Sequence, residues 1–220
     1  FACRTIPIGF PANGAGRDLA LALDDLCRQA EAAVAQGERI LILTDRELPD
    51  GTMAIPTLLA VSAVNRHLLR TGRRTGVDIA VETGEAREVM HMALLLGYGA
   101  SAVNPYLAFE ILVDLALRNR LSKDVGATTA LELYIKALCK GLLKTMSKMG
   151  ISTLRSYRGA QVFEAVGLNR DVVGAYFEGT ASRIGGIGLD EIAHEACARY
   201  STAHEPEDTA PKVLASGGHY

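Results

Sequence analysis

Charged and amide side chains follow three predicted strands of this 220-residue chain. Asp45 and Arg46 come directly after one apolar run, Glu82 and Glu85 follow a second, and Asn104 ends a third. Because parallel strands bring their carboxyl ends to one edge of a sheet, we expect these five side chains to share a rim, where α/β proteins place their sites. Such a rim could bind an anionic metabolite. Strand-end Asp, Glu and Asn more often cap helices and satisfy loop backbone groups.

A second candidate lies where a lysine-rich helix gives way to a hydroxyl-rich stretch after Gly150. Lys136, Lys140, Lys144 and Lys148 recur every four residues, so they share one helical face. That face is either solvated or in contact with an acidic neighbouring domain, and the sequence favours neither. The stretch after Gly150 contains small polar residues and two arginines, and we interpret it as a tight turn and not as a phosphate loop.

Motifs for metals and cofactors are weak. Residues 183–190 are glycine-rich and precede a predicted helix, but they lack the GxGxxG spacing and no strand is predicted before them. Glu88 and His91 have the spacing of a di-iron bundle motif, yet a single copy is more often a helix-surface pair. The four cysteines form no CxxC pair, and we expect reduced thiols, most of them buried. We therefore predict no metal, cofactor or catalytic residue.

The composition limits the class of protein. A hydrophobic fraction of 49% supports a sizeable core, and a formal net charge of −2 gives no surface for nucleic acid or an anionic membrane. Apolar runs such as 92–96 are too short to cross a bilayer, and no signal peptide is recognisable. These observations indicate a cytoplasmic protein.

The elements that would position the rim alternate along the first half of the chain. Helices are predicted at 17–36, 57–72, 86–96 and 107–118, and strands at 39–44, 77–81 and 101–104. The run at 39–44 is typical of a strand buried on both faces. This alternation predicts an α/β fold with a partial (β/α) barrel-like parallel sheet. A mainly helical C-terminal part follows, with helices at 127–149, 169–177 and 189–203 and a short strand at 161–166.

Five stretches carry a family resemblance: IPTLLAV at 55–61, ETGEAREV at 82–89, LLGYGASAVNPYLAFE at 95–110, KGLLKTMSKMGISTLRSYRGAQVFEAVGL at 140–168 and YFEGTASRIGGIGLDEIA at 176–193. Together they resemble the later half of the central domain of the glutamate synthase large subunit, and the most specific part is 146–168. The resemblance runs from about residue 8 to 203. We therefore expect a central-domain segment at 1–203 and, at 204–220, a linker towards a flavin-binding domain.

The resemblance implies a division of labour within a longer polypeptide. A glutaminase domain releases ammonia from glutamine, and a domain with FMN and a 3Fe-4S cluster combines it with 2-oxoglutarate to make L-glutamate. Electrons come from ferredoxin, or from NADPH through a small reductase subunit with FAD. The central domain joins the two active domains and walls part of the ammonia path, without a cofactor.

On this interpretation we expect a tunnel wall or domain interface at seven residues: Ser147, Lys148, Ser152, Thr153, Ser156, Tyr157 and Gln161. Its partners would be the glutaminase and FMN domains. The alternative is a free-standing barrel enzyme that binds an anionic metabolite at the rim of Asp45, Arg46, Glu82, Glu85 and Asn104.

Overall fold

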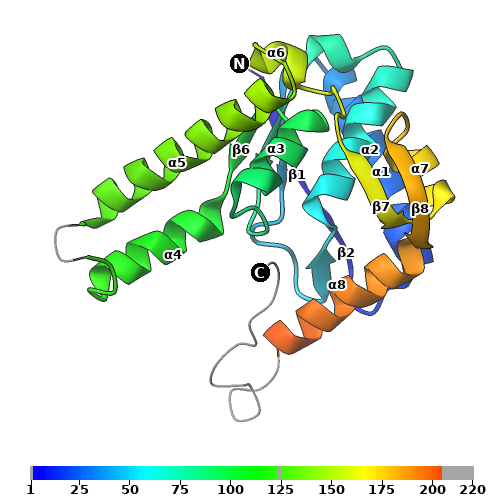
Figure 1. Cartoon of the computed structure of the whole chain (residues 1–220). Helices are drawn as coiled ribbons and strands as arrows, with labels where there is room; N and C mark the ends of the chain where they lie inside the picture. The colour runs from blue at the N-terminus through cyan, green and yellow to red at the C-terminus, as the bar shows by residue number, and fades with distance from the viewer. Residues whose placement is uncertain (1, 123–124, 205–220) are drawn as a thin grey trace.

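A four-stranded parallel sheet forms the centre of the computed structural model, which describes residues 2–122 and 125–204 (Figure 1). Its strands lie in the order β1 (Cys3–Pro7), β3 (Ile40–Thr44), β5 (Asp78–Glu82) and β6 (Ala102–Asn104). Helices connect successive strands, which is the arrangement of a partial barrel. The predicted α/β class is confirmed.

The two faces of this sheet differ in burial. One face is formed by side chains that are at most 1% exposed: Ile6, Leu41, Leu43, Ile79 and Val81. On the opposite face, Ile40, Ile42 and Ala80 are only half-buried. The prediction that the strand at 39–44 is buried on both faces is therefore wrong, because its second face remains partly open to solvent.

Three helices connect the strands and pack beside one another: α1 (Gly16–Ala35), α2 (Thr57–Arg70) and α3 (Val89–Gly97). Leu19, Leu23 and Leu26 of α1 point into the core at the spacing the sequence predicts. Gly37 after α1 has φ +96°, in the left-handed region where glycine ends helices without strain. The third helix starts at Val89 and not at residue 86.

A short antiparallel pair, β2 (Gly9–Pro11) and β4 (Thr52–Ala54), was not predicted. Each strand has only three residues, and β2 ends in proline, so neither has a periodic signal. Phe10 and Met53 pair across the two strands and lie in the core. The pair therefore extends the core beyond the carboxyl ends of β1 and β3.

Helices α4 (Tyr106–Leu117) and α5 (Ala127–Lys148) contact each other and project from the rest of the molecule (Figure 1). They expose several large apolar side chains: Leu107, Ile111, Leu117, Leu133, Ile135 and Leu143. Lys136, Lys140, Lys144 and Lys148 are all exposed on α5. In the described part of the chain, none of these lysines forms an ion pair.

The C-terminal part combines helices with a second small sheet. It contains α6 (Leu154–Tyr157), β7 (Glu164–Leu168), α7 (Arg170–Tyr176), β8 (Ala181–Ile187) and α8 (Leu189–Ala203). Strands β7 and β8 pair in parallel, and α8 packs on α1, where Asp190 Oδ1 accepts a hydrogen bond from Gly16 N at 3.1 Å. The linker predicted at 204–220 lies, apart from His204, outside the described residues.

Two further expectations concern thiols and membranes. Cys3 and Cys139 are exposed, and Cys27 and Cys197 are half-buried, so the prediction that most thiols are buried is wrong. All four are free. Among the described residues, no helix has both the length and the apolar character that a membrane span requires.

Candidate functional site

The predicted rim exists at the carboxyl end of the central sheet. Thr44, Glu82 and Asn104 are register partners on β3, β5 and β6, so their side chains start from neighbouring positions. The backbone continues this pairing beyond the strands, because Asp45 N donates to Glu82 O at 3.2 Å and Thr83 N donates to Asn104 O at 3.0 Å. The prediction that polar strand ends meet at one edge is confirmed for this edge.

Asp45 is occupied by the neighbouring loop. One of its oxygens accepts a hydrogen bond from Thr83 Oγ1 at 2.5 Å, and Gly84 N donates to the carboxylate at 3.0 and 3.1 Å. Thr83 is fully buried, and its hydroxyl also contacts Thr57 Oγ1 at 2.8 Å. Asp45 therefore fixes the loop after β5 in the way that strand-end carboxylates commonly do.

Glu82 and Arg46 form the charged centre of the rim. Glu82 accepts hydrogen bonds from Thr44 Oγ1 at 2.8 Å and from Asn104 Nδ2 at 3.4 Å, and its Oε1 lies 3.5 Å from Arg46 Nη1. Arg46 also donates to Glu110 Oε1 at 2.8 Å and stacks 4.9 Å above the ring of Tyr106. The one rim cation that the sequence predicts is thus already paired with two carboxylates.

Glu85 caps a helix. Its Oε2 accepts a hydrogen bond from Thr57 N, the first residue of α2, at 2.7 Å, which places a negative charge at the positive end of the helix dipole. Arg199 of α8 approaches its other oxygen at 4.0 Å. Glu85 has a structural role at the rim, and it belongs to the same hydrogen-bonded group through Thr57 and Thr83.

The charge of the rim is negative. Asp45, Glu82, Glu85 and Glu110 supply four carboxylates, against the guanidinium of Arg46 and the more distant one of Arg199. Burial, followed by the neighbouring charge of Asp45, raises the pKa of Tyr106 to about 12. Thr83 and Tyr106 follow the predicted strands directly and belong to the rim, whereas Glu110, which lies one helical turn further on in α4, was not predicted as a rim member.

The second candidate begins where α5 ends. Gly150 N donates to Ser147 O at 3.1 Å and Ile151 N donates to Met146 O at 3.0 Å, which is a Schellman motif with Gly150 at φ +71°. Thr153 then caps α6, since its Oγ1 accepts a hydrogen bond from Ser156 N at 3.3 Å. The stretch after Gly150 is therefore a tight turn followed by a single helical turn.

This segment packs on the end of α3, where it donates hydrogen bonds to backbone carbonyl oxygens. Gln161 N donates to Gly97 O at 3.2 Å, and Tyr157 is fully buried with its hydroxyl donating to Ala93 O at 3.0 Å. The structure thus places Tyr157 in the core of this chain. Of the other predicted wall residues, Gln161 is half-buried and five are exposed: Ser147, Lys148, Ser152, Thr153 and Ser156.

The weaker motifs have structural explanations. A strand, β8, does lead into the glycine-rich stretch at 183–190, so the prediction that no strand precedes it is wrong. A side chain at Gly186 would overlap the backbone of Gly167 in β7, which explains a glycine there. His91 Nδ1 accepts from the backbone of Arg87 and Glu88 at the start of α3. Among the described residues, no group of three or more His, Cys, Asp or Glu could hold a metal ion.

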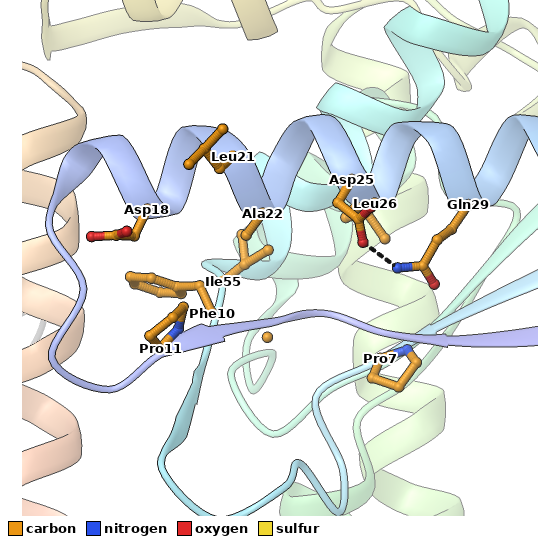
Figure 2. A pocket seen from close by; sticks show the side chains of 11 residues that line it. Pro7, Phe10, Pro11, Asp18, Leu21, Ala22, Asp25, Leu26, Gln29 and Ile55 are labelled. Atoms are coloured by element: carbon orange, nitrogen blue, oxygen red, sulfur yellow. Dashed lines mark hydrogen bonds between the residues drawn. The ribbon is translucent and has the colours of Figure 1, made fainter.

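A cavity of about 330 Å³ lies between α1 and the segment of β1 and β2 (Figure 2). Two carboxylates line it: Asp18 accepts a hydrogen bond from Ala15 N at 2.8 Å, and Asp25 accepts hydrogen bonds from Gln29 at 2.6 Å and from Arg28 at 3.0 Å. The hydrogen bonds from Gln29 and, to a lesser extent, Arg28 lower the pKa of Asp25. Apart from these carboxylates and Gln29, the lining side chains are apolar, such as Phe10 and Leu26, and no rim residue is among them.

Comparisons with known proteins agree on one family. The family described as "Glutamate synthase central domain" matches residues 1–169. The large chain of an NADPH glutamate synthase from Bacillus subtilis is 50% identical over 203 residues, which is 92% of this chain and 13% of that protein. A ferredoxin-dependent chloroplastic glutamate synthase from Spinacia oleracea is 42% identical over 219 residues, 94% of this chain and 13% of that protein. This chain therefore spans about an eighth of the length of these relatives.

Likeness to solved structures is looser. A ligand-free DHODH from Eimeria tenella superposes with a TM-score of 0.43 at 16% identity, over 72% of this chain and 39% of that one. A likeness of this size carries no argument about function.

Proposed function

This chain belongs to the family of glutamate synthase central domains, and we propose that it serves a longer glutamate synthase as a non-catalytic connector. In this proposal it holds the glutaminase and FMN domains in place and walls part of the ammonia path between them. The complete protein would make L-glutamate from 2-oxoglutarate and ammonia derived from glutamine.

The observation that carries the proposal is the internal pairing of the rim. Asp45 accepts a hydrogen bond from the loop after β5, and Glu85 accepts one from the first residue of α2. Arg46 pairs with Glu82 and Glu110. A substrate would have to displace these contacts, and their excess of carboxylates would repel an anion. The geometry therefore favours a connector over the free-standing enzyme that binds an anionic metabolite.

The placement of the cysteines and glycines supports our proposal that the cofactors of the family are held outside this segment. Cys3, Cys27, Cys139 and Cys197 lie in four different elements, β1, α1, α5 and α8, and among the described residues no three His, Cys, Asp or Glu side chains come together as metal ligands. The glycine-rich stretch at 183–190 forms β8 and the start of α8, and its Gly186 serves strand contact. In our proposal FMN and the 3Fe-4S cluster are held by other parts of the polypeptide.

The electron donor would likewise be handled elsewhere. The relatives from Bacillus subtilis and Spinacia oleracea are named for NADPH and for ferredoxin, yet both match nearly all of this chain, at 50% and 42% identity. A segment shared by proteins with different donors need not contact either. This supports placing the small reductase subunit, or ferredoxin, against another domain.

The connector role can be tested by measuring how tightly glutamine hydrolysis is coupled to glutamate formation. In the complete polypeptide, Ser152→Asp places a charge in the exposed turn between α5 and α6, and Ser201→Asp places the same charge at the exposed end of α8. A path for neutral ammonia must exclude charge and water. We expect Ser152→Asp to leave glutamine hydrolysis running while glutamate formed per glutamine hydrolysed falls below one, and Ser201→Asp to keep the ratio of the parent.

If aspartate variants at every exposed position of the predicted wall, from Ser147 to Ser156, leave the coupling unchanged, this segment does not wall the ammonia path.

A separate experiment tests the rim. Asp45→Asn should lower the free energy of unfolding and leave the KM for 2-oxoglutarate unchanged, whereas a large rise in that KM without loss of stability would favour a binding site at the rim.

A further inference from the structure

A cavity of about 950 Å³ lies at the amino end of the central sheet, opposite the acidic rim. It is bounded by the first residues of β3 and β5, by the end of α2 and by the segment around α6, which lies at the top of Figure 1. Four arginines from three segments far apart in the sequence line it: Arg39, Arg74, Arg155 and Arg158. Asp78 is the one acidic residue of this lining, which leaves a formal excess of three positive charges.

Arg74 is held rigidly by neutral acceptors. Its Nε donates to Asn65 Oδ1 at 2.6 Å, its Nη1 to Val77 O at 2.5 Å and its Nη2 to Gly99 O at 2.8 Å. A guanidinium has five N–H groups, so these contacts leave two donors unused. None of the three acceptors is charged, so the positive charge of Arg74 is not neutralised by them.

Arg158 stands beside Arg74 and is only partly neutralised. Its Nη1 donates to Asp78 Oδ1 at 2.9 Å and to Ser101 Oγ at 2.5 Å, which leaves Nε and Nη2 available. Burial, and then the nearby charge of Arg158, lower the pKa of Arg74. The two cations at the floor of the cavity therefore repel each other.

Arg39 and Arg155 complete the lining and are exposed. Arg39 Nη1 donates to Gly76 O at 3.2 Å, and within the described ranges Arg155 has no hydrogen bond or ion pair. Unused guanidinium donors that converge on one open space suit an oxyanion, because the planar fork matches carboxylate and phosphate oxygens. The volume falls in the range of small-molecule sites.

We propose that this basic cavity binds a small, multiply charged oxyanion of the phosphate-ester or polycarboxylate class. Arg74 and Arg158 form a preorganised floor, and Arg39 and Arg155 close over the ligand from the sides. Binding would relieve the repulsion between the two floor cations. The inference does not rest on the proposed connector role, because it concerns the opposite end of the sheet and its readout is binding.

The test is calorimetric titration of the complete polypeptide with sodium pyrophosphate and, separately, with sodium citrate, against sodium chloride at equal ionic strength. The double variant Arg39→Gln, Arg155→Gln removes two exposed cavity cations and leaves the half-buried Arg74 in place. The matched control Arg28→Gln, Arg118→Gln removes two exposed cations elsewhere, at α1 and just after α4. We expect pyrophosphate, citrate or both to bind. The Kd should rise by at least about tenfold in the cavity variant and stay unchanged in the control variant.

A second measurement keeps the proposal testable if the cavity variant does not fold. Pyrophosphate should protect Arg39 and Arg155 of the parent protein from phenylglyoxal, read by mass spectrometry, and should leave Arg28 and Arg118 unprotected. Three results would overturn the proposal: binding of neither anion, equal weakening in the control variant, or equal protection of all four arginines.

Discussion

Tyr157 connects the segment after α5 to the core through one side chain. It is fully buried, and its hydroxyl reaches the carbonyl oxygen of Ala93 in α3 at 3.0 Å. Burial raises the pKa of this hydroxyl, so it remains a donor throughout the neutral range. The loss of a buried hydrogen bond is unfavourable, so this position should be sensitive to substitution.

Replacing Tyr157 by phenylalanine tests that contact. The ring remains in place but Ala93 O loses the hydroxyl donor that it accepts from in addition to its place in α3, so we expect the free energy of unfolding to fall by about 0.5–1.5 kcal/mol. Tyr134→Phe is the control, since its hydroxyl bonds to Arg87 O at 2.7 Å in an exposed setting where water can replace it. Urea unfolding of both variants gives the comparison. Equal losses in the two would contradict the role of burial.

Cys27 gives a prediction about pH. Burial, and next the charge of Asp24, raise the pKa of its thiol to about 11, and only the thiolate reacts with alkylating agents. At pH 8 we expect folded protein to be alkylated at exposed Cys3 and Cys139 well before Cys27. The rate at Cys27 should rise as the pH increases towards 11, and urea should abolish the difference. Mass spectrometry of timed samples measures this, and modification of Cys27 at the rate of Cys139 would contradict it.

At the scale of elements, two helical glycines have opposite surroundings. Gly141 of α5 lies against α3, where an added methyl group would overlap the side chain of Val89. Gly174 of α7 has no neighbouring atom within 4 Å of such a methyl group. The first glycine permits close packing of two helices, whereas the second only makes its own helix less favourable.

Alanine at each position should therefore act in opposite directions. Gly174→Ala should raise the free energy of unfolding by about 0.5–1 kcal/mol through helix propensity. Gly141→Ala has the same propensity gain but must separate α5 from α3, and we expect a net loss of about 1–3 kcal/mol from overpacking. The two variants are each other's control in urea unfolding. Stabilisation by both would show that α5 and α3 are free to move apart.

The elements also show which features the sequence can reveal. The strands at 40–44 and 78–82 were predictable because apolar runs lie between helices that end at glycine, and the rim followed from their shared carboxyl ends. Strand β8 was missed because all of its residues are exposed and two adjacent ones are glycine, so no alternation exists. The basic cavity was missed because its arginines stand up to 119 positions apart, from 39 to 158, and only the folded chain brings them together.

At the scale of the whole molecule, much apolar surface is uncovered. Leu143 on α5 is 65% exposed and Ile184 on β8 is 60% exposed, in elements that other parts of a longer polypeptide would contact in the proposed role. Large exposed apolar side chains promote association between copies when they lie in patches. The 220 residues alone should therefore behave differently from the complete protein.

We expect the isolated chain to self-associate, and the double variant Leu143→Glu, Ile184→Glu to reduce this. Because both side chains are largely exposed, the change in the free energy of unfolding should stay within about 0.5 kcal/mol. Ala198→Glu, at an exposed site on α8, adds charge without removing a large apolar group and serves as the control. Sedimentation velocity measures the outcome. An isolated chain that is monomeric at high concentration would contradict the expectation.

The opposite charges at the two ends of the central sheet give the molecule an electric moment along its strands. Carboxylates gather where the strands finish and guanidinium groups where they start. A charged protein surface that approaches this molecule would exert a torque on it before the two come into contact. The torque acts over roughly 8 Å, the Debye length at physiological ionic strength. In a longer polypeptide, this moment would orient the domain relative to charged neighbouring domains before their surfaces came into contact.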